Sequence, residues 1–160
     1  MHGEAQFLLC HHHAAAPSRF GAQFRSAVVG QDALAPFAAP DADGAPRWSL
    51  SDDAEDVPYL AYSDESGLGR IVEAQRFADR IQGLRTVFSA RLAASLMTMA
   101  REGRGVAWLP VSLVESEVAL GRLVRAGGAD LEIPVDIRVF RPTARQSLAA
   151  EAFWAELAAR

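Results

Sequence analysis

Residues 93–125, AASLMTMAREGRGVAWLPVSLVESEVALGRLVR, contain the pattern that decides the fold. Leu96 and Met99 recur at helical spacing in the first part of this stretch, and Gly103 marks the end of the expected helix. The run VAWL at 106–109 has the continuous hydrophobicity of a strand that is buried on both faces of a sheet. A second helix follows the strand, so the stretch predicts an α/β arrangement.

The same alternation of strands and helices extends outward on both sides. The strands that we expect are residues 6–10, 57–62, 86–88, 106–109, 123–125 and 131–140. Helices are expected from residues 63–66 to about Ile81, from Ser89 to Gly103, from Ser112 to Gly121, and after Thr143. Alternation of this kind predicts βαβ units and a mostly parallel sheet.

Three local patterns predict how these elements are joined and capped. Gly30-Gln31-Asp32 separates two apolar runs, 24–30 and 33–38, which indicates a β-hairpin. Residues 40–56 are rich in Asp, Ala, Gly and Pro without periodicity, which is typical of a surface loop. Two capping boxes are expected, and they pair Ser112 with Glu115 and Thr143 with Gln146.

The composition excludes several classes of function. The chain has 160 residues and a formal net charge of −4, whereas a domain that binds nucleic acid usually carries a basic patch. The single cysteine, Cys10, excludes an internal disulfide and fits a reducing compartment. Neither a membrane span nor an export signal is recognisable, so we expect a cytoplasmic location.

Two junctions between a strand and a helix are candidate ligand sites. Ser63 and Ser66 follow one expected strand, and Ser89 and Arg91 follow the next. Ligands of open α/β sheets lie at the carboxyl ends of the strands, and a helix N-terminus attracts anions. The alternative interpretation is that the serines only cap helices and that Arg91 is a solvated surface charge.

Catalytic and metal sites are not expected. Residues 11–13 are consecutive histidines next to Cys10, but zinc ligands are usually separated by two or more residues. No histidine lies beyond residue 13 to activate a serine, and the nucleophile-elbow and phosphate-loop patterns are absent. Met97 and Met99 could sense oxidants, but core packing is the favoured interpretation for residues on an apolar stripe. We therefore expect no metal, no cofactor and no enzyme activity.

The chain resembles the regulatory domain of LysR-type transcription regulators. The resemblance extends to the closing segments, IRVFRP at 137–142 and AAEAFWAELAAR at 149–160, and it covers nearly the whole chain. The residues of 93–125 that match the family signature in order are Gly103, Gly105, Leu109, Pro110, Gly121, Arg122 and Leu123.

This resemblance implies a fold like that of the type 2 periplasmic binding proteins, with two α/β lobes and mixed, mostly parallel sheets. Residues 1–40 and 131–160 would form an incomplete first lobe, residues 57–130 the second lobe, and residues 41–56 a connection. The DNA-binding domain of the family and the opening strand and helix of the first lobe would be missing from this chain.

The resemblance also implies a function and a set of contacts. The chain would bind a small, anionic effector in a cleft between the lobes, with DNA bound only through the missing domain and with a homodimer or tetramer in the full-length protein. The expected effector-binding residues are Ser63, Ser66, Ser89, Arg91, Ser95, Trp108 and Pro110. The alternatives are a stand-alone solute-binding protein of the same fold, which would need an export signal, and a small hydrolase.

Overall fold

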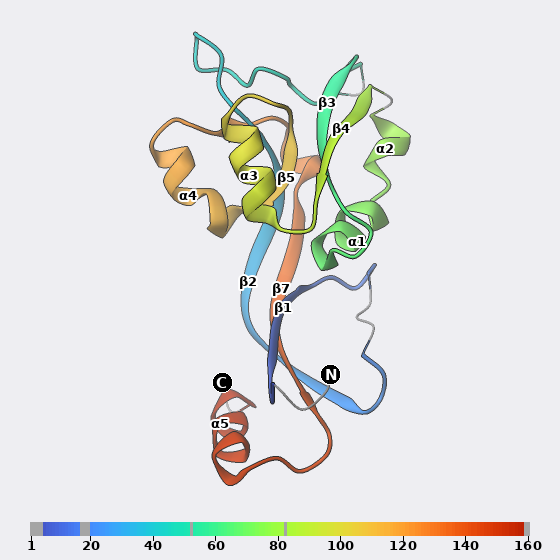
Figure 1. Cartoon of the computed structure of the whole chain (residues 1–160), viewed down its shortest axis with the longest axis vertical. Coiled ribbons are helices and arrows are strands. Elements are labelled where there is room, and N and C mark those ends of the chain that lie inside the picture. The colour runs from blue at the N-terminus through green and yellow to red at the C-terminus, as the bar shows by residue number, and fades with distance from the viewer. Residues whose placement is uncertain (1–4, 17–19, 52, 82, 159–160) are drawn as a thin grey trace. The chain divides into compact units, whose positions relative to one another are not determined.

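The computed structural model describes residues 5–16, 20–51, 53–81 and 83–158 (Figure 1). The chain divides into two compact units, Met1–Gln31 with Val135–Arg160, and Asp32–Pro134. We call them the first and the second unit. The boundary falls inside strands β2 (Phe24–Ala38) and β7 (Ile133–Pro142), so both strands contribute to each unit. The expected first lobe includes residues 1–4 and 159–160, which lie outside the described residues. The assignment of residues to lobes stays a prediction.

In the first unit, β1 (Leu8–His12) pairs antiparallel with β7, from Leu8 opposite Phe140 to His12 opposite Asp136. Helix α5 (Leu148–Ala158) follows β7 in the sequence. A partly buried ion pair joins the two elements, because both terminal nitrogens of the buried Arg141 donate to the half-buried Glu151 carboxylate at 2.9 and 2.8 Å.

The second unit contains both parallel and antiparallel strand pairs. Strands β3 (Val57–Tyr62) and β4 (Leu84–Ala90) are parallel, and β3 meets β5 (Ala107–Pro110) at a parallel bridge between Tyr59 and Val106. Both β5 and β6 (Val124–Arg125) pair antiparallel with β2. The expected parallel pairing is therefore found at β3 and β4, whereas the partners of β2 in this unit run in the opposite direction.

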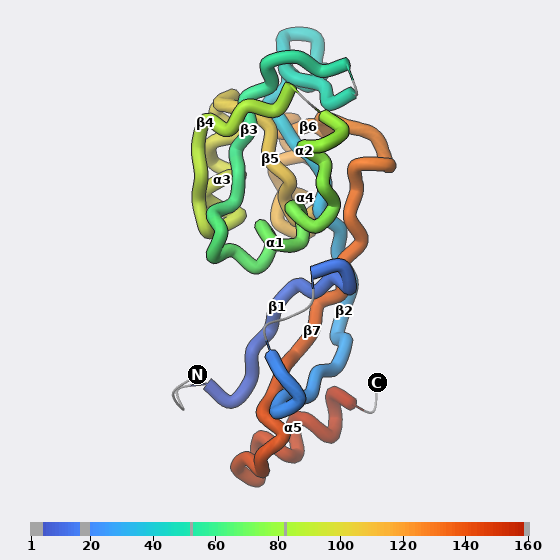
Figure 2. The backbone as a smooth tube through the Cα atoms, turned by 90° about the vertical axis from the view of Figure 1, so that its right-hand side faces the viewer, coloured from blue at the N-terminus to red at the C-terminus, as the bar shows by residue number. Residues whose placement is uncertain are grey.

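Helices cover both sides of these strands. Figures 1 and 2 show α3 (Ala93–Arg101) and α4 (Val111–Ala119) on one side, and α1 (Gly67–Ala74) and α2 (Phe77–Arg80) on the other. A short 3₁₀ helix, η1 (Ala129–Leu131), precedes β7. The core of the unit includes the fully buried side chains of Leu34, Leu60, Leu96, Val106, Leu109 and Val114. Among the described residues, no helix is long and apolar enough to cross a membrane.

The predicted β-hairpin at residues 30–32 is wrong, because β2 is one continuous strand of 15 residues. Its polar residues serve tertiary contacts instead of a turn. The Asp32 carboxylate accepts hydrogen bonds from the Ser112 hydroxyl at 2.5 Å and from the Ser112 amide at 3.2 Å.

The predicted capping boxes are also wrong, for related reasons. The Ser112 hydroxyl is engaged by Asp32, and the residue before α4 is Pro110, which has no side-chain cap. Thr143 donates to the Gln23 carbonyl, whereas the Ser147 hydroxyl accepts from the Ala150 amide at the start of α5. In both cases the serine or threonine that was expected to cap a helix forms a hydrogen bond with a residue distant in sequence instead.

The helix expected to run to Ile81 is two helices, α1 and α2. The chain breaks at Arg76, which has a positive φ of 55°. The expected start is confirmed, because the Ser66 hydroxyl accepts from the Gly69 amide as the N-cap of α1. Met97 and Met99 are half-buried in α3, which leaves their expected role in packing or in oxidant sensing open.

We predict that the ion pair between Arg141 and Glu151 makes the stability of the chain depend on pH. The hydrogen bonds that the Glu151 carboxylate accepts lower its pKa from 4.5 to about 2. The bond from Arg141 has the largest effect, and the bond from the Gln146 amide adds to it. The stability that the ionised Glu151 contributes is fully present above the pKa of the unfolded chain, and it is lost as the pH falls toward the lower pKa of the folded chain. Glu151→Gln should therefore lower the urea midpoint at pH 7, and the difference from the wild type should shrink between pH 5 and pH 3.

Glu156→Gln is the matched control, because Glu156 is exposed on the same helix. It should leave the midpoint unchanged over the same pH range. A constant difference between the Glu151→Gln variant and the wild type at all pH values would contradict the assignment of the shift to this carboxylate.

Candidate functional site

The two junctions singled out in the sequence lie side by side. In the parallel pair of β3 and β4, Ala61 lies opposite Ser89 and Tyr62 lies opposite Ala90. The Ser63 amide then donates to the Ala90 carbonyl at 3.0 Å, which holds the two strand ends together. The segments that contain Ser63 and Ser89 therefore meet at one edge of the unit, as expected for the ends of neighbouring parallel strands.

Ser89 does not cap a helix, so this part of the interpretation is wrong. Strand pairing continues through Ala90, and α3 begins only at Ala93, after Leu92, which makes no side-chain cap. Arg91 consequently precedes the helix instead of lying in its first turn. Its side chain is 70% exposed and lies 3.9 Å from the Glu65 carboxylate, a distance typical of a weak surface ion pair.

The other predicted site residues are distributed around this edge. Ser66 is buried as the cap of α1, and Ser95 is exposed in the first turn of α3. Trp108 and Pro110 are buried in β5. Contact between an effector and any of the seven predicted residues stays a prediction.

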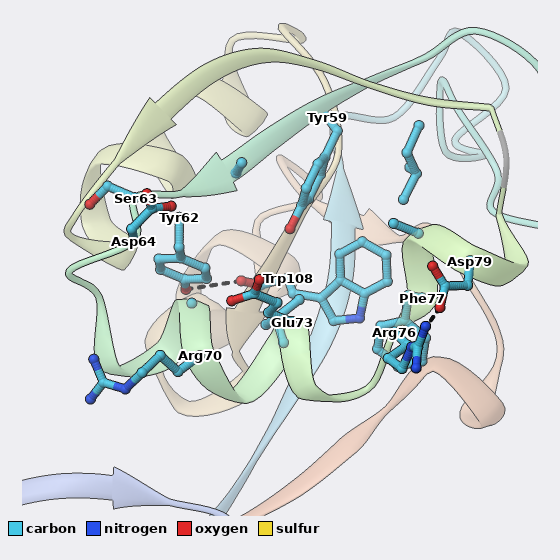
Figure 3. A pocket seen from close by; sticks show the side chains of 15 residues that line it. Tyr59, Tyr62, Ser63, Asp64, Arg70, Glu73, Arg76, Phe77, Asp79 and Trp108 are labelled. Atoms are coloured by element: carbon cyan, nitrogen blue, oxygen red, sulfur yellow. Dashed lines mark hydrogen bonds and ion pairs between the residues drawn. The ribbon is translucent and has the colours of Figure 1, made fainter. Parts of the chain in front are cut away.

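A cavity of about 510 Å³ lies within the second unit, between α1, α2 and strands β3 and β5 (Figure 3). It includes two of the predicted residues, Ser63 and Trp108, whereas the other five lie outside its lining. The complete lining is Tyr59, Ala61, Tyr62, Ser63, Asp64, Gly69, Arg70, Val72, Glu73, Arg76, Phe77, Ala78, Asp79, Leu84 and Trp108. Its volume lies within the range of about 300 to 1,000 Å³ that is typical of small-molecule sites.

Trp108 is the centre of the apolar wall. Its side chain is almost completely buried, and its indole N–H donates to the Leu131 carbonyl at 3.0 Å. The Phe77 ring stacks on the indole at 5.1 Å, and the Tyr59 ring stands at 87° to it with centroids 5.7 Å apart. These contacts fix the orientation of three of the aromatic side chains that line the cavity.

The two tyrosine hydroxyls of the cavity differ in their partners. The Tyr62 hydroxyl donates to the Trp108 carbonyl at 2.9 Å, and burial raises the pKa of Tyr62. Burial, together with a smaller effect of the Glu73 charge, raises the pKa of Tyr59 to about 12. Both phenols are therefore neutral near pH 7, and the Tyr59 hydroxyl forms no hydrogen bond with a described residue, which leaves it available to a ligand.

Two tyrosines of β3, Tyr59 and Tyr62, both line the cavity. The register of the β3–β4 pair shifts between Tyr59 and Leu60, because Val87 of β4 is passed over between the paired residues Thr86 and Phe88. The extra residue of this irregularity therefore lies in β4. Tyr59, Tyr62 and Glu73 were not expected to line a cavity, since no motif marks them in the sequence.

Gly69 allows α1 to approach the end of β3. A Cβ at this position would lie 2.7 Å from the Tyr62 Cβ and 3.2 Å from the Ser63 carbonyl oxygen. Side chains larger than hydrogen would push the helix away from the strand. The glycine that weakens the helix in the sequence is therefore what permits the close packing at the cavity.

The ionised side chains of the cavity are unevenly paired. Arg76 forms an ion pair with Asp79 at 2.6 Å, and Arg70 donates to the Ser66 carbonyl at 3.4 Å. Glu73 and Asp64 form no ion pair with a described residue. In the described part of the chain, no group of three or more His, Cys, Asp or Glu side chains could hold a metal ion.

Comparison with known proteins agrees with this arrangement. Residues 3–160 match the model of the LysR substrate binding domain. The HTH-type transcriptional regulator YjiE of Escherichia coli (strain K12) is 31% identical over 124 residues, which cover 78% of this chain and 40% of that protein. The HTH domain-truncated transcriptional regulator QseD of Escherichia coli O157:H7 is 32% identical over 100 residues, which cover 62% of this chain and 41% of that protein.

Full-length HypT from Salmonella typhimurium, described as a hypochlorite-specific LysR-type transcriptional regulator, is similar in structure. It superimposes with a TM-score of 0.80 at 29% identity, over 98% of this chain and 52% of that chain. The regulatory domain of HypT has also been solved with a bound bromide ion. The chain spans about two fifths of the length of the curated relatives that it matches.

The ends of two parallel strands lie beside a cavity of small-molecule size. The fold is like that of the type 2 periplasmic binding proteins and is shared with the regulatory domain of HypT. These features are those of the ligand-binding domain of a transcription regulator. The chain belongs to the LysR substrate-binding domain family. The family resemblance and the fold class expected from the sequence are thereby confirmed, and this family comprises regulatory domains and not enzymes.

We predict that Tyr62→Phe destabilises the chain and that Tyr59→Phe does not. The Trp108 carbonyl is buried in β5, and loss of the Tyr62 hydroxyl would leave it without this donor. An unsatisfied buried carbonyl costs about 1–3 kcal/mol. Urea unfolding of both variants measures the difference. Equal midpoints for Tyr62→Phe and the wild type would show that this hydrogen bond contributes nothing to stability.

Proposed function

We propose that this chain is the effector-sensing part of a LysR-type transcription regulator, and that it binds a small anion at the adjacent ends of β3 and β4. The observation that carries the proposal is the parallel pairing of Ala61 with Ser89, which brings Ser89 at the end of β4 and Ser63 after the end of β3 to one edge. The expected contacts are those predicted from the sequence, with Ser63, Ser89 and Arg91 nearest to that edge.

The charge at this edge supports an anionic ligand. The Arg91 guanidinium is exposed and only loosely associated with Glu65, so an anion could recruit it without breaking a strong ion pair. The bromide-bound form of the HypT regulatory domain supports the same proposal, because it shows that a related domain accepts a small anion. Hypochlorite, named in the description of full-length HypT, is also a small anion.

The proposal extends to the organisation of the full protein. Residues 57–130 would form the second lobe, and residues 1–40 with 131–160 would contribute to the first. A separate helix-turn-helix domain would bind DNA, as the name of the HTH-type regulator YjiE suggests, and the regulatory domains would associate as a dimer or tetramer in the cytoplasm. An effector would act by binding one conformation of that assembly more tightly than the other.

We predict that Arg91→Ala weakens anion binding without changing the fold. The charge of Arg91 would contribute directly to the bound anion, so the dissociation constant for bromide should rise by about five-fold or more at constant ionic strength. Isothermal titration of the 160-residue chain with sodium bromide measures the change. Because Arg91 is exposed, the melting temperature of the unliganded chain should stay the same.

Arg104→Ala is the matched control, since Arg104 is an exposed arginine between α3 and β5. It removes the same charge from the same unit and should leave bromide binding unchanged. If the two variants bind bromide equally, the effect of Arg91 is one of net charge, and the assignment of the site is wrong.

A further inference from the structure

The cavity beside Trp108 has aromatic walls on several sides. Tyr59 and Trp108 stand nearly perpendicular, and Phe77 supports the far face of the indole by stacking on it. Tyr62 closes the side toward the end of β3, where its hydroxyl bonds the Trp108 carbonyl (Figure 3). Aromatic faces attract cations within about 6 Å of the ring centre, and tryptophan does so most strongly.

A solvent-exposed carboxylate also lines this cavity. Glu73 of α1 lines the cavity, and in Figure 3 it points into the same space as the Tyr59 hydroxyl. The two groups also interact electrostatically, because the charge of Glu73 contributes to the raised pKa of Tyr59. Since Glu73 has no ion-pair partner among the described residues, its negative charge is not neutralised within the cavity.

The arginines of the cavity do not neutralise this charge. Arg76 is bound to Asp79, and the Arg70 side chain extends away from the aromatic rings in Figure 3. A second carboxylate, that of Asp64, lies at the Tyr62 end of the cavity. The lining therefore combines aromatic rings with two exposed carboxylates that the arginines leave without an ion pair, a combination that disfavours an anion and favours a cation.

We propose that this cavity binds a small organic cation of the alkylammonium class beside the half-buried Tyr59 ring, with the nearly buried Tyr62 and Trp108 behind it and the Glu73 carboxylate as its counter-charge. The Tyr59 hydroxyl is available as an acceptor for an N–H donor, or as a donor for a hydroxyl of the ligand. This site lies within the second unit and differs in charge from the anion site proposed at the ends of β3 and β4. The proposal therefore goes beyond the proposed function and does not require it.

Choline and its neutral isostere, 3,3-dimethylbutan-1-ol, separate the effect of charge from that of shape. Isothermal titration of the 160-residue chain should show choline binding, and the isostere should bind at least about ten-fold more weakly. Glu73→Gln should weaken choline binding by about five- to ten-fold and leave binding of the isostere unchanged. Because Glu73 is exposed on α1, the variant should keep the melting temperature of the wild type.

Two controls keep the result specific. Glu65→Gln removes an exposed carboxylate near the same strand end but outside the cavity lining, and it should leave choline binding unchanged. Arg91→Ala should weaken bromide binding and not choline binding, so the failure of one site is distinguishable from the failure of the other. The proposal is overturned if choline does not bind at about 10 mM, if the isostere binds equally well, or if Glu73→Gln has no effect.

Discussion

The structure of the second unit depends on the burial of Trp108. Its indole N–H is bonded to the Leu131 carbonyl, its own carbonyl accepts from Tyr62, and its ring packs against Phe77 and Tyr59. These contacts connect β5 to η1, β3 and α2, which are distant in sequence. Because a buried polar group without a partner is costly, each hydrogen bond restricts where these elements can lie. The cavity keeps its shape for the same reason.

The cavity takes its lining from elements that are separate in the sequence. Tyr59 and Tyr62 come from β3, Glu73 from α1 and Trp108 from β5. The Tyr62 hydroxyl donates to the Trp108 carbonyl, whereas the Tyr59 hydroxyl forms no hydrogen bond with a described residue. The two phenols of one strand therefore differ in role, because one joins β3 to β5 and the other is available to a ligand.

Much of the fold could be predicted from the sequence, because strand hydrophobicity and the order of the elements are encoded locally. The runs at 57–62 and 106–109 correspond to β3 and β5, and the family signature at 93–125 identified the domain. Predictions failed where a distant partner replaces a local one. Asp32 takes the hydroxyl of Ser112, and pairing with β3 holds Ser89 in a strand, so neither serine caps a helix. The acidic character of the cavity was missed because Glu73 meets Tyr59 only after folding.

The segment from Ser63 to Ser66 belongs to both parts of the candidate site. Ser63 joins the ends of β3 and β4 and also lines the cavity, while Ser66 begins α1, the helix that carries Glu73. Gly69 holds that helix against Tyr62, so movement of the segment would displace α1 and the cavity wall together. A ligand at the strand ends would change the affinity of the cavity for its ligand only if it bound two positions of this segment with different affinities. A cavity ligand would then change the affinity of the strand-end site by the same factor.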